Sequence, residues 1–364
     1  MGIYSTFIRP MAFRLDPERA HRLAIELGAG LSPLAGVLRS ALAVSDRRLA
    51  IRVADLDFPS PIGLAAGFDK SGDAIETLAA LGFGFVEIGS VSADPSEGNP
   101  RPRLFRLPAD RAIVVHYGLP NAGATRVAAR IDEVRLPVPL GVNLVKTNRG
   151  PGAAPEKADQ IIGEYVEAAQ AFAPRAYYLM LNLSCPNTED GRDFFADERH
   201  VCACLAALGE VGLDLPVFLK VSPLGGIAAI ERLLAAAEPH AFVSGFMFNL
   251  PPGKPDALHT PQDVWRDMPG AVSGPPAAPL LDHALHECYR RMDRRRYALF
   301  ASGGVFTAED AYAKIRMGAS LVAVLTALVY EGPGIVRRMA QGLARLLQRD
   351  GFKSVAEAVG ADMR

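Results

Sequence analysis

The segment 182–188 gathers several side chains whose types could do chemistry together. It reads Asn-Leu-Ser-Cys-Pro-Asn-Thr and so places amides, hydroxyl groups and a thiol within seven residues. A carboxamide both donates and accepts hydrogen bonds, so Asn182 and Asn187 could clamp a planar ring that carries carbonyl and N–H groups. The thiol of Cys185 is either a small buried apolar group or, if its surroundings favour the thiolate, a proton acceptor. The segment therefore indicates recognition of a planar imide, with the role of Cys185 open.

Other positions could bind anions. Lys70 and Lys220 each follow a short apolar run, where a buried ammonium is costly unless it meets an anion, although either side chain could instead extend outward into water. Gly303-Gly304 and Thr326 follow the last two apolar runs, where many barrel enzymes hold phosphate on backbone N–H groups. A Gly-Gly pair by itself is more often a turn, but this position favours a phosphate-bearing cofactor.

The elements that must position these residues alternate regularly after residue 55. Eight short apolar runs occur at 62–66, 85–89, 140–144, 178–183, 217–221, 242–248, 298–301 and 321–325. Stretches of helical periodicity lie at 73–81, 121–133, 158–172, 198–210, 226–237, 278–293, 307–317 and 334–347. Apolar strands that are each followed by a helix indicate a parallel sheet, and eight such units predict a (β/α)8 TIM barrel. An open doubly wound sheet is the alternative, but no run leads into G-x-G-x-x-G or G-x-x-x-x-G-K-[ST].

In a barrel, the polar residues that follow the runs share the face at the carboxyl ends of the strands, where barrel enzymes place their chemistry. The segment 91–120 is long for a strand-to-helix connection, and we expect it to cover the mouth of the barrel. Residues 1–50 have apolar residues at helical spacing, and Asp16-Pro17-Glu18 is typical of a helix start. The pattern predicts two amphipathic helices that either pack on residues 51–364 or dock on a membrane surface.

Composition limits the function classes. The 364 residues include 39 basic and 40 acidic side chains, so net charge provides no argument for nucleic-acid binding. The four cysteines include no C-x-x-C pair, and neither a disulfide framework nor a metal site is expected. The longest nearly uncharged apolar run, 319–330, is shorter than the roughly 20 residues that cross a bilayer, and the N-terminus has no pattern of a cleavable signal.

Several stretches together resemble the dihydroorotate dehydrogenases, in particular their quinone-reducing, membrane-associated class (class 2). They are FRLDPERAHRL at 13–23, PIGLAAGFDK at 61–70, EIGSVS at 87–92, PRLFRL at 102–107, GVNLVKTN at 141–148, NLSCPNT at 182–188 and GP at 332–333. The resemblance implies an FMN-binding barrel that oxidises dihydroorotate to orotate and passes electrons to a membrane quinone. It also implies a protein that lies peripherally on the cytoplasmic face of the cell membrane, with residues 1–50 as the docking and quinone-admitting segment.

Residue roles follow from the same resemblance. The residues implied to contact FMN are Ala66, Gly67, Ser90, Asn143, Asn182, Lys220, Gly274, Gly304 and Thr326. Lys70 is implied to bind the substrate carboxylate, and Asn182, Asn187 and Asn249 its ring amides. Cys185 falls at the position of the catalytic base, and His21 and Arg106 along the quinone route.

Some positions depart from the family pattern. Cys185 stands where the quinone-linked class usually has serine, although a thiol ionises more readily than a hydroxyl. Val115 replaces an asparagine, Phe248 and Leu250 replace threonines on either side of Asn249, and Leu325 replaces a tyrosine. A lost partner for a buried polar group costs about 1–3 kcal/mol. Two alternatives therefore stay open: an FMN enzyme of the same family with a less polar small substrate, and a catalytically silent flavin-binding homologue.

Overall fold

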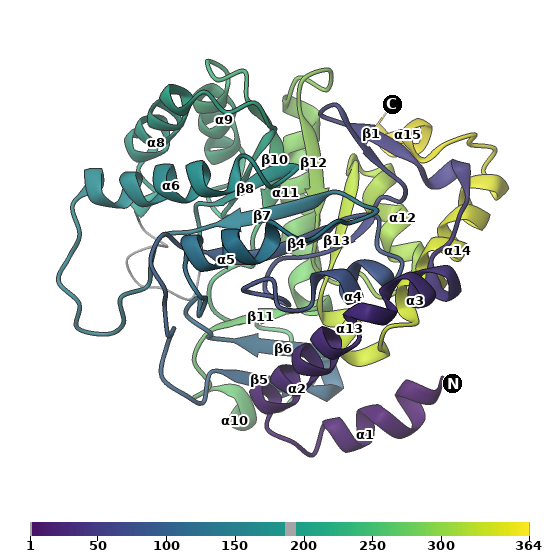
Figure 1. Cartoon of the computed structure of the whole chain (residues 1–364). Coiled ribbons are helices and arrows are strands. Elements are labelled where there is room, and N and C mark those ends of the chain that lie inside the picture. The colour runs from purple at the N-terminus through teal and green to yellow at the C-terminus, as the bar shows by residue number, and fades with distance from the viewer. Residues whose placement is uncertain (1, 186–193, 364) are drawn as a thin grey trace.

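The structure is a computed structural model that describes residues 2–185 and 194–363. Its centre is a closed barrel of eight parallel strands, in the order β10-β12-β13-β3-β4-β7-β8-β9 (Figure 1). The strands are β3 (Ile62–Leu64), β4 (Val86–Val91), β7 (Leu140–Leu144), β8 (Tyr178–Asn182), β9 (Val217–Val221), β10 (Val243–Phe248), β12 (Ala298–Ala301) and β13 (Leu321–Val324). Every predicted apolar run is a strand, and the TIM-barrel prediction is confirmed.

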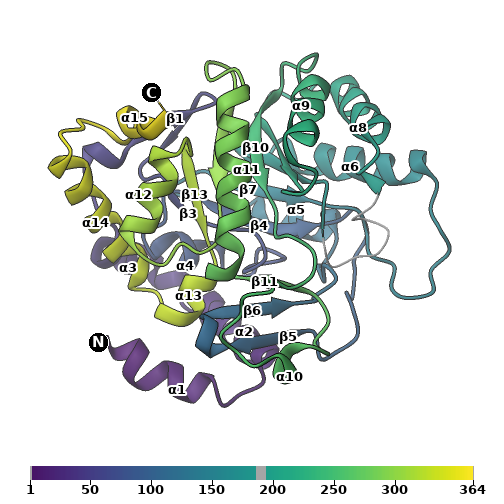
Figure 2. The ribbon, with the colours of Figure 1, turned by 180° about the vertical axis from the view of Figure 1, so that it is seen from behind.

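Helices cover the outer face of the barrel, as Figure 2 shows for α9, α11 and α12. They are α4 (Ile75–Ala80), α5 (Ala124–Ile131), α6 (Ala158–Phe172), α8 (Glu198–Val211), α9 (Gly226–Ala237), α11 (Ala278–Arg291), α12 (Ala308–Arg316), α13 (Thr326–Glu331) and α14 (Ile335–Arg349). Local chemistry sets their starts: at α12, the Thr307 hydroxyl accepts the Asp310 N–H at 3.1 Å, and the Asp310 carboxylate accepts the Thr307 N–H at 2.9 Å.

Aromatic side chains fill the barrel interior near the amino ends of the strands. Phe85, Phe218 and Phe300 pack edge to face, with ring centroids 5.5 Å apart for Phe85–Phe300 and 4.8 Å apart for Phe218–Phe300. Glycine makes room for them, because a Cβ at Gly63 would lie 2.3 Å from the Phe85 ring and one at Gly141 would lie 2.1 Å from the Tyr178 ring. This aromatic layer fills the barrel interior on the amino-terminal side of the polar residues at the strand ends.

Two small sheets lie at opposite ends of the barrel (Figure 1). The hairpin β1 (Ile51–Val53) and β2 (Leu56–Phe58) packs its buried Phe58 against Phe85 at the amino ends of the strands. A three-stranded antiparallel sheet of β5 (Leu104–Leu107), β6 (Ala112–Val115) and β11 (Ala271–Ser273) lies at the other end. The segment 91–120, expected as a long loop, therefore contains two strands, because Leu107, Ala112 and Val114 form a small buried cluster with Val272 from a distant part of the chain.

The N-terminal extension has one helix more than the two predicted. A π-helical turn (Tyr4–Ile8) runs into α1 (Arg9–Ala12), and α2 (Pro17–Gly30) and α3 (Ala35–Leu42) follow. Asp16 caps α2, since its carboxylate accepts the Arg19 N–H at 2.9 Å. Pro33 separates α2 from α3 because it lacks the N–H that a continuous helix requires. The boundary at residue 50, between the N-terminal segment 1–50 and the FMN-binding barrel domain 51–364, stays a prediction.

The same extension exposes apolar side chains on its outer surface. Ile3, Phe7, Met11, Leu27 and Val37 are exposed, and none of the helical residues described in 4–42 is fully buried. Within residues 2–185 and 194–363, no helix is both long and apolar enough to cross a bilayer.

Candidate active site

One cavity of about 980 Å³ runs from the N-terminal helices to the carboxyl ends of the barrel strands. It brings together nearly all the side chains that the sequence singled out. The predicted site residues that line it are His21, Ala66, Gly67, Lys70, Ser90, Arg106, Asn182, Cys185, Lys220, Asn249, Gly274, Gly304 and Thr326. Asn143 is fully buried directly behind this lining, and Asn187 lies outside the described residues.

A chain of hydrogen-bonded amides forms the inner wall of the cavity. The Ser90 hydroxyl donates to Asn143 Oδ1 at 2.5 Å, and the amide of Asn182 donates to Ser90 Oγ at 3.2 Å. Asn249 Nδ2 donates to Asn182 Oδ1 and to the Ser184 carbonyl, both at 3.0 Å, while its Oδ1 accepts the Leu250 N–H at 2.9 Å. Asn249 therefore uses its amide to hold Asn182 and its own loop in place.

Glu87 is a buried carboxylate at the base of this chain that the sequence reasoning missed. Its Oε1 accepts from Asn143 Nδ2 at 3.0 Å and its Oε2 from the Tyr178 hydroxyl at 3.2 Å. Burial raises the pKa of Glu87, and the charge of Lys220 lowers it. Burial lowers the pKa of Lys220, and the charge of Glu87 raises it. A glutamate inside an otherwise apolar strand was the signal that could have found this pair.

Cys185 lines the same cavity as Lys220. Its side chain is 3% exposed and lines the cavity. A thiolate at Cys185 would raise the pKa of Lys220. The sequence thus places a thiol, a lysine and two amides around one space, as their positions after separate strands predicted.

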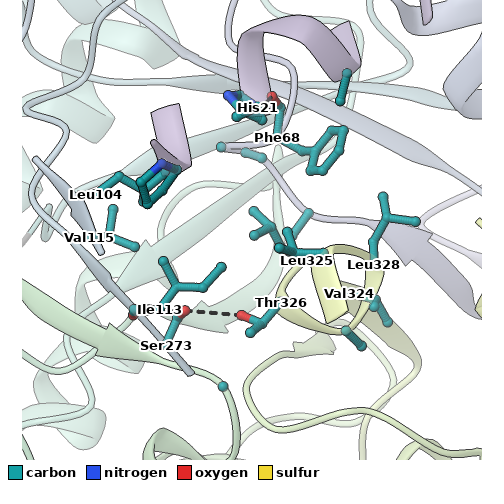
Figure 3. A pocket seen from close by; sticks show the side chains of 18 of the residues that line it. His21, Phe68, Leu104, Ile113, Val115, Ser273, Val324, Leu325, Thr326 and Leu328 are labelled. Atoms are coloured by element: carbon teal, nitrogen blue, oxygen red, sulfur yellow. Dashed lines mark hydrogen bonds between the residues drawn. The ribbon is translucent and has the colours of Figure 1, made fainter. Parts of the chain in front are cut away.

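The far end of the cavity has the features of an anion site. Gly303 and Gly304, with φ of +80° and +71°, follow β12, and within the described ranges their N–H groups have no protein acceptor. The Ser273 and Thr326 hydroxyls lie 3.0 Å apart (dashed line in Figure 3), and the turn that begins α11 starts beside them at Gly274. Unsatisfied backbone donors, hydroxyl groups and a helix start suit a phosphate group. The residues present therefore fit a phosphate-bearing cofactor.

The opposite end meets the N-terminal helices. His21 Nε2 lies 2.7 Å from the Phe68 carbonyl, and burial followed by the nearby charge of Lys70 lowers the pKa of His21 to about 3. Arg106 donates to the Leu15 carbonyl at 3.0 Å and lies over the Phe13 ring at 4.5 Å. Burial lowers the pKa of Lys70 to about 8. His21 therefore lies where α2 contacts the loop after β3, and Arg106 lies where the segment before α2 contacts β5 of the three-stranded sheet.

Apolar side chains line the side of the cavity that the three-stranded sheet forms, together with the residue after β13. Val115 and Ile113 from β6 and Leu325 after β13 line the same cavity (Figure 3). Leu119 and Leu250 line it as well. The sequence departures at 115, 250 and 325 therefore all fall in the lining of this cavity. Val115, Leu250 and Leu325, here called the apolar wall, offer no side-chain hydrogen bonds there.

The fold is that of a barrel enzyme, and the residues at the carboxyl ends of its strands suit a phosphate-bearing group and a small anion. A family model described as dihydroorotate dehydrogenase matches residues 48–347. The chain therefore belongs to the dihydroorotate dehydrogenase family.

Individual relatives agree with this assignment over nearly the whole chain. A dihydroorotate dehydrogenase (quinone) from Sphingopyxis alaskensis is 40% identical over 361 residues, which cover 97% of this chain and 95% of that protein. One from Thermobifida fusca is 39% identical over 378 residues, which cover 99% of this chain and 97% of that protein. The ligand-free crystal structure of DHODH from Eimeria tenella superposes with a TM-score of 0.83 at 29% identity, covering 96% of this chain and all (100%) of that chain.

Proposed function

We propose that this chain oxidises dihydroorotate to orotate, uses FMN as its cofactor, and passes the electrons to a quinone in pyrimidine biosynthesis. The observation that carries the proposal is the single cavity of about 980 Å³, which joins the polar strand ends to the apolar N-terminal helices. Such a cavity gives a charged small molecule and an apolar quinone access to one cofactor from different sides.

The phosphate of FMN suits the N–H groups of Gly303 and Gly304 and the hydroxyl of Thr326, with Gly274 close by. Its ring would be held by Ala66, Gly67, Ser90, Asn143, Asn182 and Lys220. Bound FMN would supply the redox chemistry, which is uptake of the hydride from substrate C6 and transfer of the electron pair to the quinone. The role of Lys220 is to place a positive charge where negative charge accumulates on reduction.

The substrate carboxylate meets the ammonium of Lys70, and Asn182 orients the ring of the substrate. Cys185 takes the proton from C5 as the hydride leaves C6, so the substrate loses one proton and one hydride, which together are two protons and two electrons. Asn187 and Asn249 are the other two amides that the proposal assigns to the substrate ring. Asn249 contributes by holding Asn182, because its own amide is already satisfied by protein groups.

The quinone enters between the N-terminal helices and passes His21 and Arg106. The exposed apolar side chains Phe7, Met11 and Leu27, together with Arg9 and Arg14 in the same segment, suit an interfacial helix pair on a membrane surface. We place the protein as a peripheral protein on the cytoplasmic face of the cell membrane, with residues 1–50 as its docking segment.

Anaerobic titration of the purified protein tests the proposal directly. We expect a yellow protein whose flavin absorbance is lost on adding dihydroorotate and returns on adding a quinone. FMN that stays oxidised under millimolar dihydroorotate would exclude this function. Colourless protein that FMN cannot reconstitute would instead point to a silent homologue.

A second candidate function follows from the apolar wall of Val115, Leu250 and Leu325. An FMN enzyme with this wall would suit a less polar dihydro compound, because fewer hydrogen-bond partners face its substrate. Flavin reduction by such a compound but not by dihydroorotate would favour this candidate over the first.

A further inference from the structure

Tyr117 lies between the two functional ends of the cavity. It belongs to the loop between β6 and α5 and lines the cavity together with Lys70 and His21. Lys70 follows β3 of the barrel, whereas His21 belongs to α2 of the N-terminal extension. One tyrosine therefore contacts a candidate substrate residue on one side and a candidate quinone residue on the other.

The ring of Tyr117 holds the Lys70 ammonium. Lys70 Nζ lies 3.8 Å from the ring centroid and donates a hydrogen bond to the Gly67 carbonyl at 2.9 Å. A lysine side chain has four flexible carbons, so these two contacts remove most of its freedom. An ammonium has three donors, and the arrangement leaves capacity for an anion in the cavity. The ring attraction also favours the charged form that such an anion requires.

The hydroxyl of Tyr117 holds the His21 ring. His21 Nε2 must carry the proton, because it lies 2.7 Å from the Phe68 carbonyl, which can only accept. His21 Nδ1 is therefore an acceptor, and the Tyr117 hydroxyl donates to it at 3.4 Å. The His21 and Phe68 rings also meet edge to face at 5.2 Å. Both ring nitrogens are thus engaged, and the imidazole plane is fixed.

The tyrosine is itself braced by charged groups. Arg103 lies with its guanidinium carbon 5.5 Å from the Tyr117 ring centroid and donates to the carbonyls of Glu97 and Asn99 at 2.6 Å and 2.9 Å. The Glu18 carboxylate, one turn before His21 on α2, accepts from Arg103 Nη2 at 2.7 Å. Helix α2 therefore carries His21 and also holds Arg103, which lies beside the Tyr117 ring.

We propose that Tyr117 is a positioning residue for both half-reactions, with its ring placing Lys70 for the substrate anion and its hydroxyl placing His21 beside the quinone. The inference rests on the proposed function and adds one residue whose ring and hydroxyl have separate roles. The ring acts on the substrate end, and the hydroxyl acts on the quinone end.

Two variants separate these parts. Tyr117→Phe keeps the ring and removes the hydroxyl, whereas Tyr117→Met removes both and fills the space with a flexible apolar side chain. Tyr312→Phe is the matched control, because it removes a tyrosine hydroxyl that bonds Asp350 at 2.7 Å on the outer helices. The measurements are the orotate dissociation constant by calorimetry and the rates of flavin reduction by dihydroorotate and reoxidation by a soluble quinone.

Loss of a partly desolvated ring–ammonium contact corresponds to about three- to thirtyfold in affinity. We therefore expect Tyr117→Met to weaken orotate binding by that factor, raise the half-saturating dihydroorotate concentration equally, and leave the limiting reduction rate nearly unchanged. Tyr117→Phe should keep orotate affinity within about twofold of the parent and raise the half-saturating quinone concentration about threefold. The control variant should change neither constant, even if it lowers stability.

Several outcomes would overturn the inference. Orotate affinity that is unchanged or tighter in Tyr117→Met would mean that the ring does not place Lys70 productively. Equal weakening in both variants would mean that the ring is not the part that matters. Unchanged quinone saturation in Tyr117→Phe would remove the His21 role. Failure of the proposed function is distinct, since the parent flavin would then not be reduced by dihydroorotate at all.

Discussion

The charges of Glu87 and Lys220 lead to a prediction about the stability of the fold. Glu87 is 2% exposed, whereas Lys220 is half-buried and lines the cavity. Burial disfavours the charged form of each, and each charge offsets that penalty for the other. Glu87→Gln keeps a side chain that can bond Asn143 and Tyr178 but removes the charge.

The magnitude follows from this arrangement. The two groups interact by charge without a direct ion pair, so their attraction lies below the roughly 4 kcal/mol that two charges 4 Å apart have at an effective dielectric constant near 20. Removing the carboxylate also removes its own desolvation cost, so we expect Glu87→Gln to lower the free energy of unfolding by about 1–3 kcal/mol. Lys220→Met should lower it by a similar amount, for the same reason.

A double-mutant cycle isolates the charge coupling. The free energies of unfolding of the full chain are measured in urea at saturating FMN, with the FMN dissociation constant of each variant used to correct for cofactor binding. We expect the double variant Glu87→Gln/Lys220→Met to be more stable than the sum of the single effects by about 1–3 kcal/mol.

The control removes a hydrogen bond instead of a charge. Tyr178→Phe deletes one donor to Glu87 and should cost about 0.5–1.5 kcal/mol. Its effect should add to that of Lys220→Met within about 0.5 kcal/mol. Additive effects of Glu87→Gln and Lys220→Met within the same margin would refute the charge coupling.

The remaining predictions concern pH, the apolar wall and the N-terminal extension. The pKa of Lys70 is lowered to about 8, and an anion binds its ammonium form. The orotate dissociation constant should therefore be flat below about pH 8 and rise about tenfold per pH unit above it. Calorimetry of Lys70→Met should show weak binding without this rise, and a variant that keeps the pH profile of the parent would contradict the assignment. Val115→Asn should tighten orotate binding about tenfold by restoring a hydrogen-bond partner, and an unchanged constant in equilibrium titration would refute the role of this wall. Phe7→Ser and Leu27→Ser remove side chains that are 65% and 68% exposed, so each should weaken partitioning to anionic vesicles about tenfold in flotation assays at an unchanged urea midpoint. Deleting residues 1 to about 45 should leave flavin binding intact and abolish turnover with long-chain quinones, and equal activity on vesicles would contradict the docking role.

Much of the barrel could be predicted from local pattern alone. Apolar runs such as 140–144 and 217–221 coincide with β7 and β9, and the stretches 158–172 and 226–237 coincide with α6 and α9. These elements follow from periodicity, because a strand buried on both faces must be continuously apolar and a covering helix must be amphipathic. The placement of Lys70, Cys185 and Lys220 around one space follows as well, since the carboxyl ends of parallel strands share one face.

What only the tertiary structure decided are contacts between residues far apart in the chain. β11 pairs with β6 across about 160 residues, as the Ser273–Ile113 pairing shows, and nothing local to 91–120 specifies that partner. Glu87 meets Tyr178, and Tyr117 meets both Lys70 and His21, because the barrel closes and the N-terminal helices fold back over its mouth. Local pattern reports whether a residue is buried, whereas the partner of a buried polar group depends on how distant segments are packed together.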